Sequence, residues 1–144
     1  MKRLYVIAYA ALGEGLSGGD NILIELSKRW ADKLDITIKG GSQIFDAAIK
    51  KNLRHTQVKF DICPSYLKFG RYIERLFWAL RTAFKFNGKD CIVYTASDFW
   101  HDSLVGWIIK LRFPSVKWIA GYYLVAPHPF AKDNPYRKKG KWIV

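Results

Sequence analysis

Apolar and polar residues follow one another along the chain in two patterns, one typical of strands and one typical of helices. Apolar or alternating runs rich in β-branched residues predict strands at residues 4–11, 35–39, 56–62, 92–95 and 117–123. Apolar residues at helical spacing predict helices at about residues 18–30, 42–52, 67–87 and 100–113, with Ser42 as the cap of the second. This alternation predicts an α/β fold: a Rossmann-like parallel sheet with helices on both faces, in a three-layer sandwich.

The helix predicted at residues 67–87 has two distinct faces. Its apolar arc consists of Phe69, Tyr72, Ile73, Leu76, Phe77, Leu80, Ala83 and Phe84. Its basic arc consists of Arg71, Arg75, Arg81 and Lys85, with Trp78 in the middle. A basic arc alone is typical of a solvated outer face, whereas a large aromatic side chain among exposed cations also suits a helix that lies on an anionic membrane surface. Both interpretations place the basic arc at the surface.

The formal net charge of +12 is large for 144 residues and indicates an anionic partner, such as a phosphate-bearing ligand, lipid head groups or nucleic acid. Nucleic acid is the least favoured, because no binding module is visible and the basic residues are spread over several elements. The apolar runs are shorter than the roughly 18 residues of a membrane span, and Cys63 and Cys91 form no metal-spaced pair. We therefore expect a cytoplasmic protein with reduced thiols, whose contact with a membrane would be peripheral, at its inner face.

The pattern changes after residue 125. Residues 126–136 are proline-rich and without periodicity, residues 137–141 are basic, and the chain closes on three apolar residues. We interpret residues 1–125 as one Rossmann-like domain and residues 126–144 as a segment that leads toward a second domain absent from this sequence. A lone domain would leave an apolar cleft side exposed, so we expect self-association or a separately encoded partner chain.

Polar residues follow the strand at 92–95, and ligands of parallel sheets bind outside such carboxyl ends. The favoured interpretation is that Ser97 or Asp98 caps the next helix. The other of these two residues can then face the ligand-binding cleft at this edge of the sheet. His101 and Asp102 lie beside them in the sequence. A surface position in the first helical turn is favoured for His101 over a role as a base. The three histidines of the chain do not form a metal-ligand set.

The glycine-rich segment after the first strand has Gly13, Gly15 and Gly18 in the G-x-G-x-x-G spacing of dinucleotide-binding proteins. In that class the second strand ends in a carboxylate, whereas here it ends in Lys39, so a nicotinamide cofactor is not expected. Gly18 and Gly19 at the start of a helix instead suit the approach of another phosphate group to backbone N–H groups. No Gly-Lys-Ser/Thr segment of nucleotide hydrolases is present.

Three segments together resemble the N-terminal half of a GT-B glycosyltransferase, most closely family 4, also called group 1. They are Gly18-Gly19, the Tyr-Thr-Ala-Ser-Asp-Phe-Trp segment at 94–100 with Asp102, and the segment at 117–130 that begins Lys-Trp-Ile-Ala-Gly-Tyr-Tyr. The resemblance covers essentially the whole chain. It implies an enzyme with two Rossmann-like domains, of which the first binds an acceptor and the second binds a nucleotide-sugar. Transfer would run in the cleft between them with retention of configuration, without metal or another cofactor.

The resemblance also implies roles for single residues. Gly18 and Gly19 would approach the donor phosphates, and Asp98 would be the catalytic carboxylate. The acceptor side of the cleft would be formed by Ser97, His101 and Asp102. The implied acceptor is a glycan or a lipid-linked molecule, and the chain without a donor domain is expected to be inactive. The alternative is a non-catalytic basic α/β module that binds an anionic membrane or a polyanion.

Overall fold

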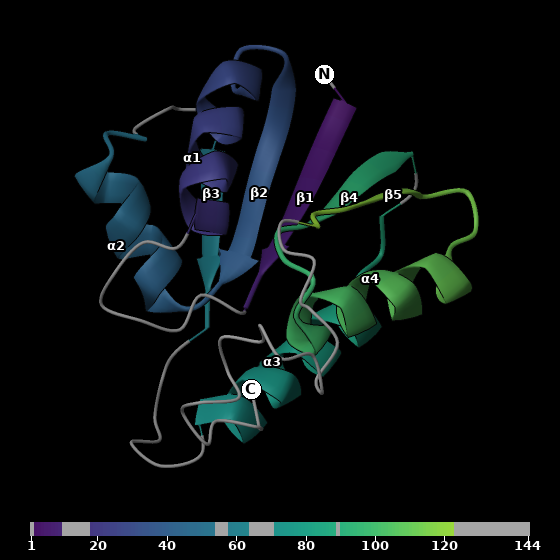
Figure 1. The fold of residues 1–144 in the computed structure, drawn as a ribbon. Coiled ribbons are helices and arrows are strands. Elements are labelled where there is room, and N and C mark those ends of the chain that lie inside the picture. The colour runs from purple at the N-terminus through teal and green to yellow at the C-terminus, as the bar shows by residue number, and fades with distance from the viewer. Residues whose placement is uncertain (1, 10–17, 54–57, 64–70, 89, 123–144) are drawn as a thin grey trace, which may run out of the picture.

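The computed structural model describes residues 2–9, 18–53, 58–63, 71–88 and 90–122. These residues form one five-stranded sheet, shown in Figure 1, in which all neighbouring strands are parallel. The strands are β1 (Lys2–Ala8), β2 (Leu34–Gly40), β3 (Val58–Ile62), β4 (Cys91–Thr95) and β5 (Lys117–Ala120), in the order β3-β2-β1-β4-β5. The predicted α/β class is confirmed.

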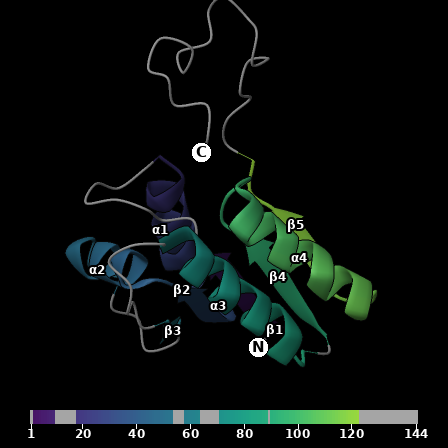
Figure 2. The same cartoon turned by 90° about the horizontal axis from the view of Figure 1, so that it is seen from below.

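Helices cover both faces of the sheet, as Figures 1 and 2 show. α1 (Gly18–Trp30) and α2 (Ser42–Lys50) pack on one face, and α3 (Arg71–Lys85) and α4 (Trp100–Arg112) lie side by side on the other. Each face has its own apolar core, and β1 contributes to both. Leu4 and Val6 belong to the core under α1, and Ile7 belongs to the core under α3 and α4. This two-sided burial explains why β1 is a nearly continuous apolar run.

Two predicted helix caps are not found. Ser42 is the first residue of α2, and Gly41 before it makes no side-chain capping hydrogen bond. The residue before α4 is Phe99, so neither Ser97 nor Asp98 caps this helix. The other element boundaries agree with the predicted ones to within a few residues.

The orientation of α3 differs from the prediction. Arg75, which was expected on an exposed basic arc, is only 6 % exposed, and Trp78 is half-buried against the core beneath α3 and α4. Ile73 and Phe77 of the apolar arc are instead 73 % and 59 % exposed. The prediction that Arg75 and Trp78 lie on an open basic surface is therefore wrong.

Small side chains explain this orientation. Ala79 and Ala83 are buried on the same face of α3 as Arg75, and they allow the helix to approach the sheet and α4 closely. Arg81 and Lys85 are exposed, as predicted. The side chain of Arg71, and the predicted features at Gly13, Gly15 and 126–144, lie outside the described residues.

Candidate functional site

The carboxyl ends of β1 and β4 lie next to each other in the sheet. Between these two strands the order in which the chain adds strands reverses. From β1 the chain moves outward to β2 and β3, and it then returns to β4 on the other side of β1. In open parallel sheets the connections diverge at such a topological switch point, and ligands bind outside the strand ends there. The candidate site therefore lies at Tyr9, just after β1, and at Ser97, just after β4.

The backbone of Tyr9 is held by two charged side chains. Its N–H donates to Asp102 Oδ1 at 2.7 Å, and its carbonyl oxygen accepts from Arg75 Nη1 at 3.0 Å. Arg75 also donates through Nη2 to Gln43 Oε1 at 3.2 Å. Asp102 and Arg75 are buried, where hydrogen bonds to charged groups are strong. This network fixes the backbone of Tyr9 at the carboxyl end of β1.

The same carboxylate also holds the loop after β4. Ser97 Oγ donates to Asp102 Oδ2 at 2.7 Å. Asp102 therefore connects Tyr9, after β1, with Ser97, in the loop after β4. Asp102 is 1 % exposed, whereas Asp98 in the same loop is exposed. The structure thus brings Ser97 and Asp102 together, and it leaves Asp98 as a carboxylate at the surface.

His101 is buried, which corrects the favoured prediction of a surface residue. It is 1 % exposed, and its ring centroid lies 4.3 Å from that of Trp100. Burial, followed by the positive charge of Arg75, lowers the pKa of His101 below its ordinary value. The imidazole is therefore neutral at neutral pH.

The phenol of Tyr9 faces the space between the sheet and α3. Its hydroxyl group lies 2.6 Å from Thr82 Oγ1, and either oxygen can be the donor. Burial raises the pKa of Tyr9, which outweighs the opposite effect of the hydrogen bond to Thr82. Tyr9 therefore stays a neutral phenol, able to donate or accept a hydrogen bond.

Gly18 and Gly19 begin α1, as predicted. A Cβ atom placed on Gly18 would meet no described atom within 4 Å. Packing among the described residues therefore does not require glycine at this position. A ligand group that approaches the backbone N–H groups of a helix start is a physical reason for glycine there.

Sequence reasoning missed Tyr9, Gln43 and Arg75 as members of the site. One local signal was available for Arg75. It is spaced four residues from Ala79, which is four residues from Ala83, so the three residues share one face of a helix. A helix face of small residues is typical of close packing, and it points Arg75 inward. No local pattern identifies Tyr9 or Gln43, because their partners lie 93 and 32 residues away along the chain.

Comparisons of the chain with protein-family models, with curated proteins and with solved structures gave no match. None of the helices described here is long and apolar enough to cross a membrane. In the same described ranges, no three His, Cys, Asp or Glu side chains are grouped as a metal ion would require.

Proposed function

We propose that the chain is the acceptor-binding half of a GT-B glycosyltransferase of the family 4 type. It would act with a donor-binding domain to move a sugar from a nucleotide-sugar to a glycan or lipid-linked acceptor. The observation that carries this proposal is the Asp102 carboxylate, which binds both the Tyr9 backbone and the Ser97 hydroxyl group. It fixes Tyr9 at the end of β1 and Ser97 after β4 relative to each other at the edge where parallel α/β proteins bind ligands.

Each site residue has a role in this proposal that fits its surroundings. Asp98 is exposed and is proposed as the catalytic carboxylate, whereas the buried Asp102 is a positioning residue that acts through Ser97 and Tyr9. No described atom lies within 4 Å of a Cβ placed on Gly18, and we propose that donor phosphates held mainly by the second domain approach there. His101 is buried in the first turn of α4 and does not contact the acceptor in this proposal.

The test is a thermal-shift measurement on the 144-residue chain with oligosaccharides, short polyprenyl diphosphate sugars, nucleotide-sugars and NAD(H). An acceptor at ten times its Kd should stabilise the fold by about 1.4 kcal/mol, which raises the Tm by about 3–6 °C. Asp98→Asn should reduce this shift, and Asp46→Asn, an exposed acid on α2, should leave it unchanged. Stabilisation by NAD(H) alone, or an equal response of Asp98→Asn, would refute the proposal.

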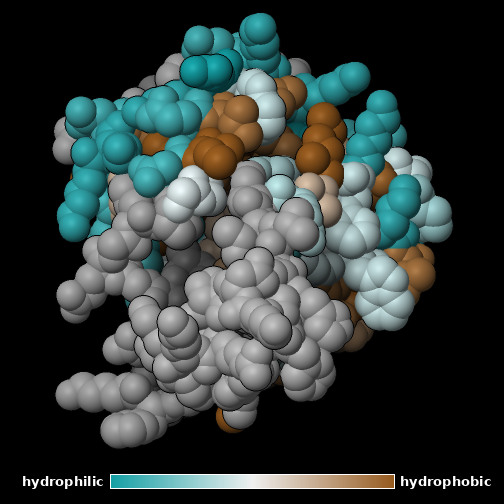
Figure 3. Space-filling view, in the orientation of Figure 1, coloured by the Kyte–Doolittle hydropathy of each residue, from teal (hydrophilic) through white to brown (hydrophobic). Residues whose placement is uncertain are grey.

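A second function, contact with an anionic membrane surface, is favoured by the outer side of α3 and α4. Five large apolar side chains are more than half exposed there, and we call them the α3–α4 apolar face: Ile73, Phe77, Phe84, Trp107 and Leu111. The α1–α2 side is mostly hydrophilic in the space-filling view of Figure 3. Apolar groups gathered on adjacent helices are typical of an interaction surface.

Basic residues border this face and decide which partner it suits. Arg81 and Lys85 are exposed on α3, and Arg112 is exposed near the C-terminal end of α4. Arg112 Nη1 donates to the carbonyl oxygens of Ala83 and Phe84, at 2.6 and 2.8 Å, and so joins the ends of the two helices. Apolar groups bordered by cations match a bilayer surface with anionic head groups. We therefore propose peripheral contact with the inner membrane face by these side chains, in place of Arg75 and Trp78.

Sedimentation with vesicles of phosphatidylglycerol and phosphatidylcholine tests this second function. Phe77→Ser should weaken binding about tenfold, since burying an aromatic ring contributes about 1.5–3 kcal/mol. Ile49→Ser is the matched control, because Ile49 is an exposed apolar residue on α2. Unchanged binding of Phe77→Ser would refute the proposal. A dimer that Phe77→Ser dissociates, without vesicle binding, would assign the face to a second copy of the chain.

A further inference from the structure

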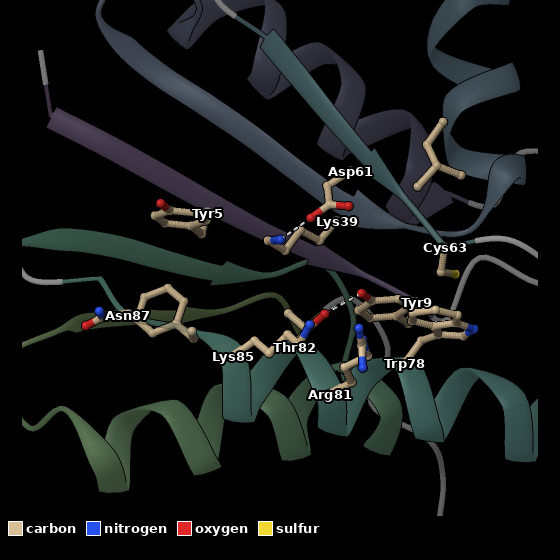
Figure 4. Close-up of a pocket in the computed structure, with 12 residues that line it drawn as sticks. Tyr5, Tyr9, Lys39, Asp61, Cys63, Trp78, Arg81, Thr82, Lys85 and Asn87 are labelled. Atoms are coloured by element: carbon tan, nitrogen blue, oxygen red, sulfur yellow. Dashed lines mark hydrogen bonds and ion pairs between the residues drawn. The ribbon is translucent and has the colours of Figure 1, made fainter.

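A cavity of about 490 Å³ lies between α3 and the strands β1, β2 and β3, and it shares Tyr9 with the switch-point site. Figure 4 shows this cavity from the side, with α3 below and the strands above. It forms because α4 covers the side of the sheet around β1, β4 and β5 and α3 packs mainly on α4, while β2 and β3 pack chiefly against α1 and α2. The volume lies within the range of about 300–1,000 Å³ that small-molecule sites occupy.

The cavity wall carries more positive than negative charge. Lys39, Arg81 and Lys85 line it together with one carboxylate, Asp61, which forms an ion pair with Lys39. Figure 4 shows Arg81 and Lys85 rising from α3 into the space below the strands. Neither Arg81 nor Lys85 has an ion-pair partner among the described residues. Their charges are therefore available to an anion in the cavity.

The position of Arg81 is fixed by its neighbour. Its guanidinium carbon lies 5.6 Å from the centroid of the Trp78 ring, which is a cation–π distance. A planar guanidinium group held in this way presents its N–H donors in the geometry that binds two phosphate oxygens. Lys85, one helical turn further along α3, adds a second cation on the same side.

The rest of the wall suits a hydroxylated carbon skeleton. The paired hydroxyl groups of Tyr9 and Thr82, the carboxylate of Asp61 and the amide of Asn87 offer both donors and acceptors. The Tyr5 and Phe86 rings, which meet edge to face at 5.2 Å between centroids, supply an apolar wall against which the C–H face of a sugar ring can pack.

We propose that this cavity binds a sugar phosphate, with the phosphate on Arg81 and Lys85 and the sugar hydroxyl groups on Tyr9, Thr82 and Asp61. The proposal stands on the cavity residues alone and does not depend on the glycosyltransferase proposal. A phosphate group on a lipid head group shares part of this chemistry, so the test includes it. Tyr9 remains a neutral phenol there, because burial raises its pKa.

Isothermal titration of the 144-residue chain with glucose 6-phosphate tests the binding, with inorganic phosphate and glucose as partial ligands. We expect saturable binding of glucose 6-phosphate and affinities at least about tenfold weaker for either part alone. The double variant Arg81→Gln/Lys85→Gln should lose about tenfold or more in affinity. The control Arg29→Gln/Lys50→Gln removes two exposed cations from α1 and α2, and it should bind like the unchanged chain.

Alkylation of Cys63 provides an independent readout of occupancy. Cys63 lines the cavity and is half-buried, whereas Cys91 is buried elsewhere and serves as the internal reference. Glucose 6-phosphate should slow alkylation of Cys63 by iodoacetamide several-fold in mass spectra. Absence of both binding and protection, or equal affinity of the Arg81/Lys85 variant, overturns the proposal. Protection by phosphatidylglycerol vesicles alone also overturns it, and it would assign the cavity to a lipid head group.

Discussion

Replacement of Asp102 by alanine tests whether this one carboxylate holds the edge of the sheet together. Its oxygens accept 2.7 Å hydrogen bonds from the Tyr9 N–H and from Ser97 Oγ, and the side chain is 1 % exposed. A hydrogen bond to a charged group contributes about 1.5–3 kcal/mol, with the larger value where a buried donor loses its acceptor. Tyr9 is buried and Ser97 is half-buried. We therefore expect Asp102→Ala to lower the free energy of unfolding by about 3–4 kcal/mol.

Urea unfolding followed by tryptophan fluorescence measures this difference. Asp102→Asn should lose less, about 1–2 kcal/mol, because its amide oxygen still accepts from the Tyr9 N–H. Ser97→Ala should lose about 1 kcal/mol, and a double-mutant cycle of Ser97→Ala with Asp102→Asn should give a coupling of about 1 kcal/mol.

Asp98→Ala is the matched control for this series. Asp98 is an exposed carboxylate in the same loop, and its removal should change the free energy of unfolding by less than about 0.5 kcal/mol. If Asp102→Ala unfolded at the same urea concentration as Asp98→Ala, the carboxylate would not stabilise the switch point. Asp102 would then not position Tyr9 and Ser97 relative to each other.

Three further predictions concern the core and the buried polar network. Gly106→Ala should destabilise the fold by about 1–3 kcal/mol, because the new Cβ would lie 2.5 Å from Trp118 Nε1. An unchanged urea midpoint would contradict this packing. Arg75→Leu should lower the free energy of unfolding by about 2–3 kcal/mol, because the Tyr9 carbonyl oxygen loses a charged donor. Arg75→Lys should lower it less, and equal urea midpoints for the two variants would argue against this contact. The pKa of His101 is lowered in the folded chain, so the unfolded chain binds the proton first, and stability should fall as the pH drops below about 6.5. His101→Gln should flatten this dependence in urea midpoints taken from about pH 7.5 to pH 5.5, and an unaltered slope would assign it to other groups.

The alternation of strands and helices could be predicted from the sequence, because each element carries its own local pattern. A central parallel strand is covered on both faces, so most of its residues must be apolar, and β1 from Leu4 onward and β4 up to Tyr94 satisfy this requirement. The helices between them carry apolar residues at helical spacing. Right-handed crossovers allow more than one strand order, so the structure decided the order and with it the switch point. A parallel sheet of any order places its ligands outside the carboxyl ends of its strands. The edge at which Ser97 and Asp102 lie was therefore predictable before their contacts were known.

Only the tertiary structure decided which side of α3 faces the sheet. Helical periodicity separates an apolar arc from a basic one. It carries no information on the hydrogen-bond partners of Arg75, which lie 66 and 32 residues away along the chain. Arg75 turns inward because Tyr9 and Gln43 accept its hydrogen bonds and because Ala79 and Ala83 permit close packing. The large apolar residues of the helix are then left on the outside. A long-range contact of the same kind holds Asp102 in the interior, because a charged group can enter a core only where distant parts of the chain satisfy it.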